Sequence, residues 1–431
     1  MKFTQFILKV NNRNGVVLLN TMNESVVYFT NDMFNKVLQD LSGGHYNTKE
    51  IKNLINLEFL IPKTVKEKNL YMNALLNEWE TNKNFCVHIL PTTACNFKCV
   101  YCYQSGIEKQ HFLDSSKAQR VIGYITEYIA DKNIETATVV IHGGEPTMNW
   151  GVVPEIMQAI DSLFKIKNIS YNTQIVTNGF NLSIEKAELL SKYNWNRLQV
   201  TIDGPKEIHD KRRPLLNNGG TYDRIVENLK NIQNNNLIEK ISIRLNFDET
   251  NWRQIKEYLP KLKELFGTDK IVLSFGYVSD TISNTSAEEF ISINGLKDDG
   301  IAKVYAKLYK EAISLGYQMP DLFMYDGMCT AKLKNALVIS ADGNIYKCLS
   351  GVGRQEFVVS NICKKQDLPN YLFPDMYAKC FKKKCPYIPL CNTGCRFNGY
   401  LKTGNIHSND CKKDTLNKIN KRLVKIKYLG G

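Results

Sequence analysis

The chain has 431 residues, of which 43% are hydrophobic and 23% are charged, a composition typical of a globular protein with two or three domains. The sequence has no apolar run near the roughly 20 residues that a membrane helix needs, and no signal peptide at its N-terminus. We therefore expect a cytoplasmic protein with no membrane partner. The formal net charge of +13 suits nucleic acid, an anionic membrane or an acidic peptide, although the lysines are scattered and much of the charge is also explained by a solvated surface.

The twelve cysteines are strongly clustered along the chain. Four lie between Cys86 and Cys102, none lies between Cys102 and Cys329, and eight lie from Cys329 onward. Because the cytoplasm keeps thiols reduced, we do not expect a disulfide framework. The clustering instead indicates metal binding.

Residues 1–80 are expected to form a small unit in which a β part precedes an α part. Three short apolar runs predict strands and two amphipathic runs predict helices, at 3–10, 15–20, 25–30, 31–41 and 48–57. A short apolar run, FLIP, and a further helix at 66–80 follow. The order of these elements resembles a winged helix.

From about residue 84 to 278, strands and helices alternate. The six predicted strands lie at 85–91, 136–144, 172–179, 197–204, 240–248 and 270–278. Five helical runs separate them, at 115–132, 152–166, 184–193, 221–234 and 252–266. This alternation predicts an α/β fold with a parallel sheet, here a partial (β/α)6 barrel, whose sites lie at the C-terminal ends of the strands.

Short motifs follow four of these strands and therefore fall at one rim. The stretch TTACNFKCVYC follows the first strand, GGEP the second, TNG the third and TIDGP the fourth. Four unrelated motifs rarely meet at one rim by chance, so we expect a functional site there.

After a helix expected at about 299–316, the tail becomes rich in cysteines and loops. It has little hydrophobic core of its own, so bound metal is expected to replace the missing apolar stabilisation. We therefore divide the chain into three predicted domains, at 1–80, 84–300 and 325–431.

Three cysteines in the first rim motif, Cys95, Cys99 and Cys102, have C-x3-C-x2-C spacing. Iron–sulfur cubanes usually take four cysteines, so a cubane on three thiolates leaves one iron open to a ligand with an amine and a carboxylate. Cys86 lies inside a strand pattern, and we interpret it as a small core residue. A zinc knuckle is the structural alternative, but it needs a fourth ligand at zinc spacing.

This spacing, with Tyr101 before the last cysteine, resembles the signature of radical S-adenosylmethionine (SAM) enzymes, and the other rim motifs follow in the matching order. The resemblance implies a 4Fe–4S cluster on the three cysteines and a bound SAM. It implies cofactor-binding roles for Tyr101, Gly143, Gly144, Glu145, Asn178, Thr201, Asp203 and Arg213.

Within this set, the glycine-rich stretch would bind the methionyl amine of SAM and Thr201 the ribose. Arg213 would bind the carboxylate, to which a guanidinium fork is well matched. Glu145 could instead cap the following loop, and Asn178 and Asp203 each precede a glycine, in pairs that are also ordinary turn formers.

The tail cysteines resemble the SPASM domain of peptide-modifying radical SAM enzymes, which holds two auxiliary 4Fe–4S clusters. The resemblance implies that the first is held by Cys329, Cys348 and Cys395. It implies that the second is held by Cys380, Cys385, Cys391 and Cys411, although the Cys380-x4-Cys385 spacing departs from the usual C-x2-C.

Cys363 is the only spare thiol near the first auxiliary set. We interpret it as a buried residue at the end of a strand, although the sequence leaves open whether it is the fourth ligand. Without it, one iron of the first auxiliary cluster stays open to a substrate thiolate, a natural soft ligand.

These resemblances imply a radical SAM maturase of a ribosomally made (RiPP) precursor peptide, with SAM and three 4Fe–4S clusters as cofactors. A 5′-deoxyadenosyl radical would abstract hydrogen from a peptide carbon. A cysteine sulfur would then bond to that carbon, giving a thioether crosslink of sactipeptide or ranthipeptide type. Residues 1–80 would bind the precursor's leader as an added strand, and a flavodoxin or ferredoxin would supply electrons.

Three alternatives remain open. A carbon–carbon crosslinking maturase would use the same machinery. An anaerobic sulfatase maturase, which makes formylglycine, has an acidic residue after the cysteine at the Cys348 position, where this chain has Leu349. A nucleic-acid-binding protein with structural zinc would explain the charge and the winged-helix pattern but not the four rim motifs, so we expect no nucleic-acid partner.

Overall fold

The computed structural model describes residues 1–104, 110–278, 287–320, 322, 329–364, 368 and 374–429. Six parallel strands form the centre of the molecule: β6 (Asn84–Ile89), β7 (Thr136–Ile141), β8 (Ser170–Thr177), β9 (Trp195–Thr201), β10 (Ile241–Phe247) and β11 (Ile271–Tyr277). Neighbours in the chain are neighbours in the sheet, from β6 through to β11. The predicted α/β fold with six parallel strands is confirmed.

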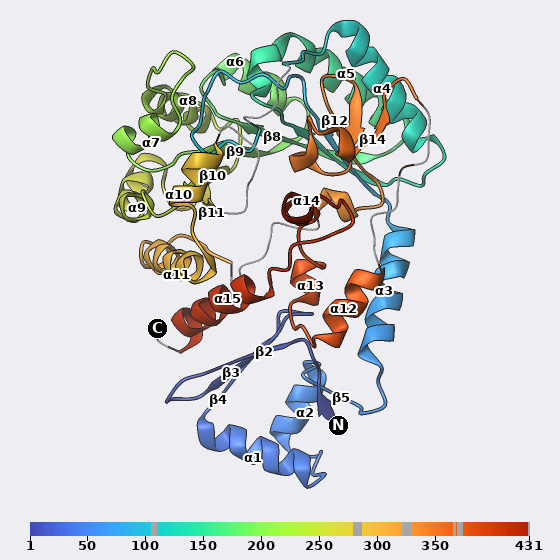
Figure 1. Cartoon of the computed structure of the whole chain (residues 1–431), viewed down its shortest axis with the longest axis vertical. Helices are drawn as coiled ribbons and strands as arrows, with labels where there is room; N and C mark the ends of the chain where they lie inside the picture. Colours follow the sequence, from blue (N-terminus) through green and yellow to red (C-terminus); the bar gives the residue numbers. More distant parts are fainter. Residues whose placement is uncertain are drawn as a thin grey trace.

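Helices connect these strands and cover one face of the sheet (Figure 1). The five predicted helices are α4 (Ser115–Ala130), α5 (Val153–Ile166), α6 (Ile184–Ser191), α8 (Tyr222–Asn234) and α9 (Trp252–Phe266). The start of α4 illustrates the local cause, because the Asp114 carboxylate accepts from Lys117 N at 2.8 Å and caps the helix. Three further helices complete this region, namely α7 (Lys206–Arg212), α10 (Glu288–Asn294) and α11 (Asp298–Ser314), of which only α11 was predicted.

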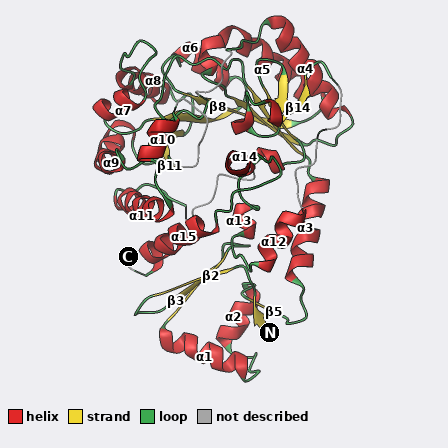
Figure 2. Ribbon diagram, in the orientation of Figure 1, coloured by secondary structure: helices red, strands yellow, loops and turns green. Residues whose placement is uncertain are grey.

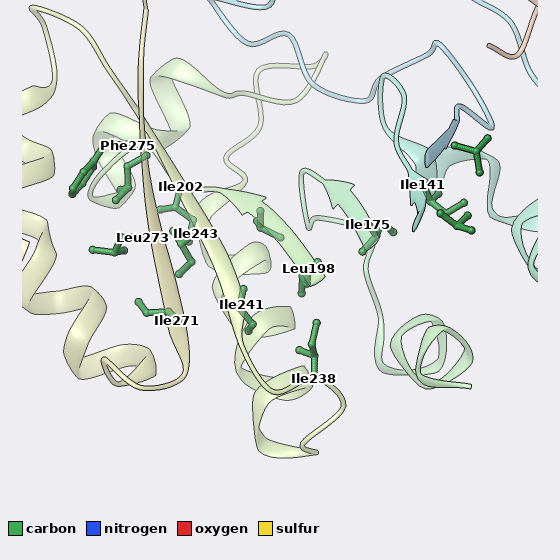
Figure 3. Close-up of a cluster of buried hydrophobic side chains, with 14 of the residues drawn as sticks. Ile141, Ile175, Leu198, Ile202, Ile238, Ile241, Ile243, Ile271, Leu273 and Phe275 are labelled. Atoms are coloured by element: carbon green, nitrogen blue, oxygen red, sulfur yellow. The ribbon is translucent and has the colours of Figure 1, made fainter. Parts of the chain in front are cut away.

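The hydrophobic core lies between the sheet and these helices. Alternate strand residues such as Ile175, Leu198 and Ile243 are fully buried, and Figure 3 shows them in one cluster with Ile141 and Phe275. Because side chains alternate across a strand, the intervening residues point to the opposite face. That face is largely polar and includes His88, Asn172, Gln174, Arg197, Gln199, Thr201, Arg244 and Asn246.

The tail extends the same sheet through β12 (Ala336–Ile339), β13 (Asn344–Tyr346) and β14 (Val358–Asn361). β12 runs parallel to β6, with Ala336 opposite Cys86. Four helices follow: α12 (Pro374–Lys382), α13 (Ile388–Cys391), α14 (Arg396–Thr403) and α15 (Lys413–Tyr428). The tail therefore has more regular structure than its sequence indicated, because its first strand pairs with the central sheet rather than with the tail itself.

The N-terminal unit contains β1 (Lys2–Phe3), β2 (Ile7–Asn11), β3 (Val16–Asn20), β4 (Val26–Phe29), α1 (Asn31–Ser42), α2 (Lys49–Asn56), β5 (Leu60–Ile61) and α3 (Glu67–Thr81). The prediction of a single strand at 3–10 is wrong, because the extended backbone is interrupted between β1 and β2. In the segment between these two strands, Thr4 N donates to Phe59 O at 3.0 Å and Gln5 N donates to Glu67 Oε1 at 2.9 Å.

The N-terminal unit packs on the tail, below the central sheet in Figure 2. The rings of Phe6 and Phe381 lie 6.2 Å apart, and those of Tyr71 and Tyr377 lie 6.1 Å apart. In the described part of the chain, no helix is long and apolar enough to cross a membrane.

Candidate active site

The first cysteine motif lies in the loop between β6 and α4. Helix α7, which follows β9, holds this loop in place, since Val100 N donates to the O atom of Arg212, the last residue of α7, at 3.0 Å. The Cys95, Cys99 and Cys102 thiols lie close enough together for the charge of one to raise the pKa of another. Burial raises the pKa of Cys95 to about 12 and that of Cys99 to about 11, so these thiols stay neutral unless a metal ion stabilises the thiolates.

The glycines of the GGEP motif press against this loop. Gly144 N donates to Thr92 O at 3.2 Å, and Glu145 N donates to Ala94 O at 2.8 Å. A Cβ on Gly143 would lie 2.4 Å from Thr92 O, and one on Gly144 would lie 2.3 Å from Ala94 O. Both positions therefore require glycine because two backbones touch there, a reason that holds whether or not SAM is bound.

The Glu145 carboxylate joins two segments of the rim, its own loop and the end of β8. It is fully buried and accepts from Thr147 N at 3.0 Å, from Thr177 Oγ1 at 2.7 Å and from Asn178 N at 2.6 Å. Asn178 Nδ2 in turn donates to Asn96 Oδ1 in the cysteine loop at 2.8 Å. Because protein donors occupy both of its oxygens, Glu145 holds the neighbouring segments in position.

Tyr101 connects the cysteine loop to the end of β9. Its hydroxyl donates to Asp203 Oδ2 and accepts from Arg213 Nη1 at 2.9 Å and from Asn246 Nδ2 at 3.2 Å. The Arg213 guanidinium also acts on the Cys99 thiol, lowering its pKa against the effect of burial. Arg213 Nε is buried and has no hydrogen-bond partner in the described part of the chain, so an anionic ligand beside the cysteines would satisfy it.

Two charged residues at this rim were missed from the sequence. The Arg212 side chain is 6% exposed and forms ion pairs with Asp203 at 3.5 Å and with Asp248 at 2.8 Å. Its guanidinium carbon lies 5.1 Å from the centroid of the Tyr101 ring. The signal was present, because Asp248 is the last residue of the fifth predicted strand, and the rim rule applied to the first four strands also applies there.

Thr201 and His209 complete the rim. Thr201 is the last residue of β9. Asp203 N donates to His209 Nδ1 at 3.2 Å, and burial lowers the pKa of His209, so this ring is neutral. The structure thus brings all eight residues predicted to bind cofactor to the rim beside the three cysteines.

Four tail cysteines surround one cavity of about 410 Å³, and they are Cys380, Cys385, Cys391 and Cys411. These are the four residues predicted to hold the second auxiliary cluster. Four thiols on one cavity are a chemically suitable donor set for an iron–sulfur cluster.

The three cysteines predicted to hold the first auxiliary cluster are also neighbours. The thiols that act electrostatically on Cys348 are those of Cys329 and Cys395, and burial raises the pKa of Cys348 to about 12. Cys363 is exposed, so its interpretation as a buried residue is wrong, and its sulfur accepts from Arg120 Nη1 of α4 at 3.6 Å. Cys86 is partly buried on the polar face of β6.

Within the described ranges, no three His, Cys, Asp or Glu side chains converge closely enough to hold a single metal ion. A cubane does not require that convergence, because each thiolate binds a different iron atom. All three cysteine sets therefore remain suitable in number and chemistry for clusters.

Comparison with known proteins agrees with this geometry. Residues 89–262 match the model of the Radical SAM superfamily. The cysteine-type anaerobic sulfatase-maturating enzyme of Clostridium novyi is 22% identical over 344 residues, which cover 73% of this chain and 89% of that enzyme. The sporulation killing factor maturation protein SkfB of Bacillus subtilis is 25% identical over 166 residues, 38% of this chain and 36% of SkfB.

Two solved structures share the fold. Native anSMEcpe with bound AdoMet and Cp18Cys peptide has a TM-score of 0.60 and 19% identity, and covers 80% of this chain and 98% of its own. Streptococcus suis SuiB bound to the precursor peptide SuiA has a TM-score of 0.55 and 14% identity, and covers 95% of this chain and 98% of its own.

Six parallel strands in chain order, with a three-cysteine loop after the first of them, are the arrangement of a partial (β/α)6 barrel. Over residues 89–262 the chain is similar to radical SAM domains. The neighbours of the chain in sequence and structure include a sulfatase-maturating enzyme, a killing-factor maturation protein and a protein solved with its precursor peptide.

Proposed function

We propose that this protein is a SPASM-type radical SAM maturase that installs thioether crosslinks in a ribosomally made precursor peptide. The observation that carries the proposal is the first auxiliary set. This set contains three thiols, and the sulfur of the spare Cys363 accepts a hydrogen bond from Arg120 of α4. A cluster on three thiolates would have one iron free for a substrate cysteine.

In this proposal, Cys95, Cys99 and Cys102 hold the radical cluster, and the rim holds SAM. The unpartnered Arg213 Nε suits the carboxylate of SAM, and the Thr201 hydroxyl at the end of β9 suits its ribose. Glu145 and Asp203 position their neighbours rather than contact the ligand. The tail cysteines hold two auxiliary clusters, giving three 4Fe–4S clusters in domains at 84–300 and 325–431.

When bound, SAM and its cluster would supply a 5′-deoxyadenosyl radical that takes a hydrogen atom from a peptide carbon. The protein's own part is to bind and orient. The polar face of the sheet presents amide and guanidinium groups, including Gln174, Arg197 and Arg244, to a peptide held between the rim and the tail. A flavodoxin or ferredoxin would exchange electrons with the clusters.

The N-terminal unit offers a groove for the leader of the precursor. β4 is the free edge of the β2-β3-β4 sheet, and a groove of about 650 Å³ lies between β4, α1 and α2. Tyr28 and Met33 line the groove and are 47% and 44% exposed, with Lys49 and Lys52 beside them. An open strand edge with apolar and basic neighbours suits an acidic leader added as a strand. The alignment with SuiB, which was solved with its precursor, covers 95% of this chain.

A sulfatase-type activity is the second candidate, because a Clostridium novyi enzyme of that kind aligns with 73% of the chain. The residue after Cys348 argues against it. Leu349 packs in an apolar cluster with Phe357 and Phe397, which leaves no acidic group at that position. A carbon–carbon crosslink would need no free iron in the first auxiliary set.

The test is anaerobic incubation of the reconstituted enzyme with SAM, dithionite and the precursor encoded nearest to its gene. We expect the peptide to lose two hydrogens per crosslink, and fragmentation to place each bond between a cysteine sulfur and a carbon. Conversion of a cysteine to formylglycine, or a bond between two carbons, would overturn the thioether assignment.

A further inference from the structure

Two lysines are buried among the tail cysteines without an acidic partner. Lys332 is 5% exposed and Lys347 is 3% exposed, and neither forms an ion pair with any residue that the structure describes. Buried Lys412, by contrast, pairs with Asp410. An isolated ammonium group buried away from water costs several kcal/mol unless negative charge lies nearby. Burial lowers the pKa of Lys332 and that of Lys347, the latter to about 8. A nearby negative charge would stabilise their ammonium forms, and no carboxylate in the described part of the chain supplies one.

The contacts of Lys332 place it between the two auxiliary cysteine sets. Its backbone N donates to Cys329 O at 2.7 Å, and its Nζ donates to Gly394 O at 3.0 Å. Gly394 belongs to the short loop between Cys391 and Cys395, which are assigned to different sets. Burial lowers the pKa of Lys332, and the groups that oppose this effect are four cysteines, two from each set: Cys329, Cys395, Cys391 and Cys380.

Lys347 has a different position. Its Nζ donates to three backbone carbonyls, those of Leu333, Lys334 and Ala336, at 2.6, 3.1 and 2.9 Å. The thiols that act on it are Cys86 and Cys329, so it faces the first auxiliary set alone. It is therefore a natural control for Lys332 in size, charge and burial.

We propose that Lys332 is a counter-cation shared by both auxiliary clusters, a positioning residue that raises the reduction potential of each. The inference rests on the proposed function, because it requires both clusters to bind. A fixed positive charge stabilises the reduced, more negative state of a nearby cluster, and the effect is strong where water is excluded. One cation between two clusters makes both easier to reduce.

The test compares Lys332→Met, Lys332→Arg and Lys347→Met in the full reconstituted chain, by redox titration followed by electron paramagnetic resonance. Cys348→Ala and Cys385→Ala assign the two auxiliary signals. In Lys332→Met we expect the equilibrium constant for reduction to fall about tenfold at both clusters, a shift of about 59 mV for a one-electron couple. Lys332→Arg should retain both potentials, and Lys347→Met should shift only the first cluster.

If Lys332→Met keeps its iron and both potentials are unchanged, or only one shifts, the shared role is wrong. Loss of both auxiliary clusters in Lys332→Met but not in Lys332→Arg would also support it, whereas loss of one cluster alone would overturn it. Wild-type protein that binds a single cluster would instead overturn the proposed function itself, so the two failures are distinguishable.

Discussion

Glu145 acts at the scale of the single residue by holding the rim in shape. Its two carboxylate oxygens accept from donors on two segments, its own loop and the end of β8, and glutamine would replace one oxygen by an NH₂ group facing those donors. We expect Glu145→Gln to lower the free energy of unfolding by about 1–3 kcal/mol, the cost of a buried donor without an acceptor. Chemical denaturation of the reconstituted protein measures this.

Glu135→Gln is the matched control. Glu135 precedes β7, its side chain is 59% exposed, and it pairs with Lys83 at the surface. Surface ion pairs contribute little, so this variant should stay within about 0.5 kcal/mol of wild type. An equal effect of the two substitutions would contradict the role given to Glu145.

The three cysteines of the first loop and Cys348 should differ in the step that each affects. Replacing Cys95, Cys99 and Cys102 together by Ala should abolish 5′-deoxyadenosine formation, because no other site at the rim offers both an open iron and the Arg213 side chain. Cys348→Ala should still release 5′-deoxyadenosine but form no crosslink. Chromatography of the nucleoside and mass spectrometry of the peptide measure the two steps separately.

If the triple variant still makes 5′-deoxyadenosine, the role of the C-x3-C-x2-C loop is wrong. If Cys348→Ala crosslinks the peptide at the wild-type rate, the first auxiliary set does not take part in bond formation.

At the scale of elements, the edge of β4 and the adjacent helix α2 form the proposed leader groove. Deleting the N-terminal unit would not test this cleanly, because Phe6 and Tyr71 pack on α12 beside Cys380. A single charge reversal leaves that packing intact. We expect Lys52→Glu to weaken binding of an acidic leader about tenfold, with more loss at low salt, because a rim charge is screened by ions.

Fluorescence anisotropy with a labelled leader peptide measures the affinity, and Lys36→Glu is the control. Lys36 is exposed on α1 but does not line the groove. Because both variants replace a lysine by a glutamate, they have the same net charge. Equal weakening by both variants would show attraction by net charge alone, and no weakening by Lys52→Glu would contradict the groove.

At the scale of the whole molecule, the three cysteine sets predict the metal content. Reconstituted protein should contain three 4Fe–4S clusters, about twelve iron atoms per chain. Replacing the seven tail cysteines that are predicted cluster ligands by Ala should leave about four iron atoms, and the sulfide content should fall in parallel. Four iron atoms in the wild type, unchanged by those substitutions, would contradict the two auxiliary clusters.

The sequence by itself determined the features that depend on local pattern. The six parallel strands and the five helices between them follow from hydrophobic periodicity, and the cysteine loop and GGEP stretch were found by spacing alone. Placing these motifs at one rim required only the rule that parallel strands end at the same edge. The structure brings together the residues that this rule selected.

Tertiary structure alone decided the contacts between residues that are far apart in the chain. Tyr101 meets Asp203 across 102 positions, and Arg212 pairs with Asp248 on the next strand. β12 joins the sheet beside β6, and Lys332 lies between two cysteine sets. No periodicity or spacing reports such pairings, because they arise when separate segments pack and buried charges must find partners.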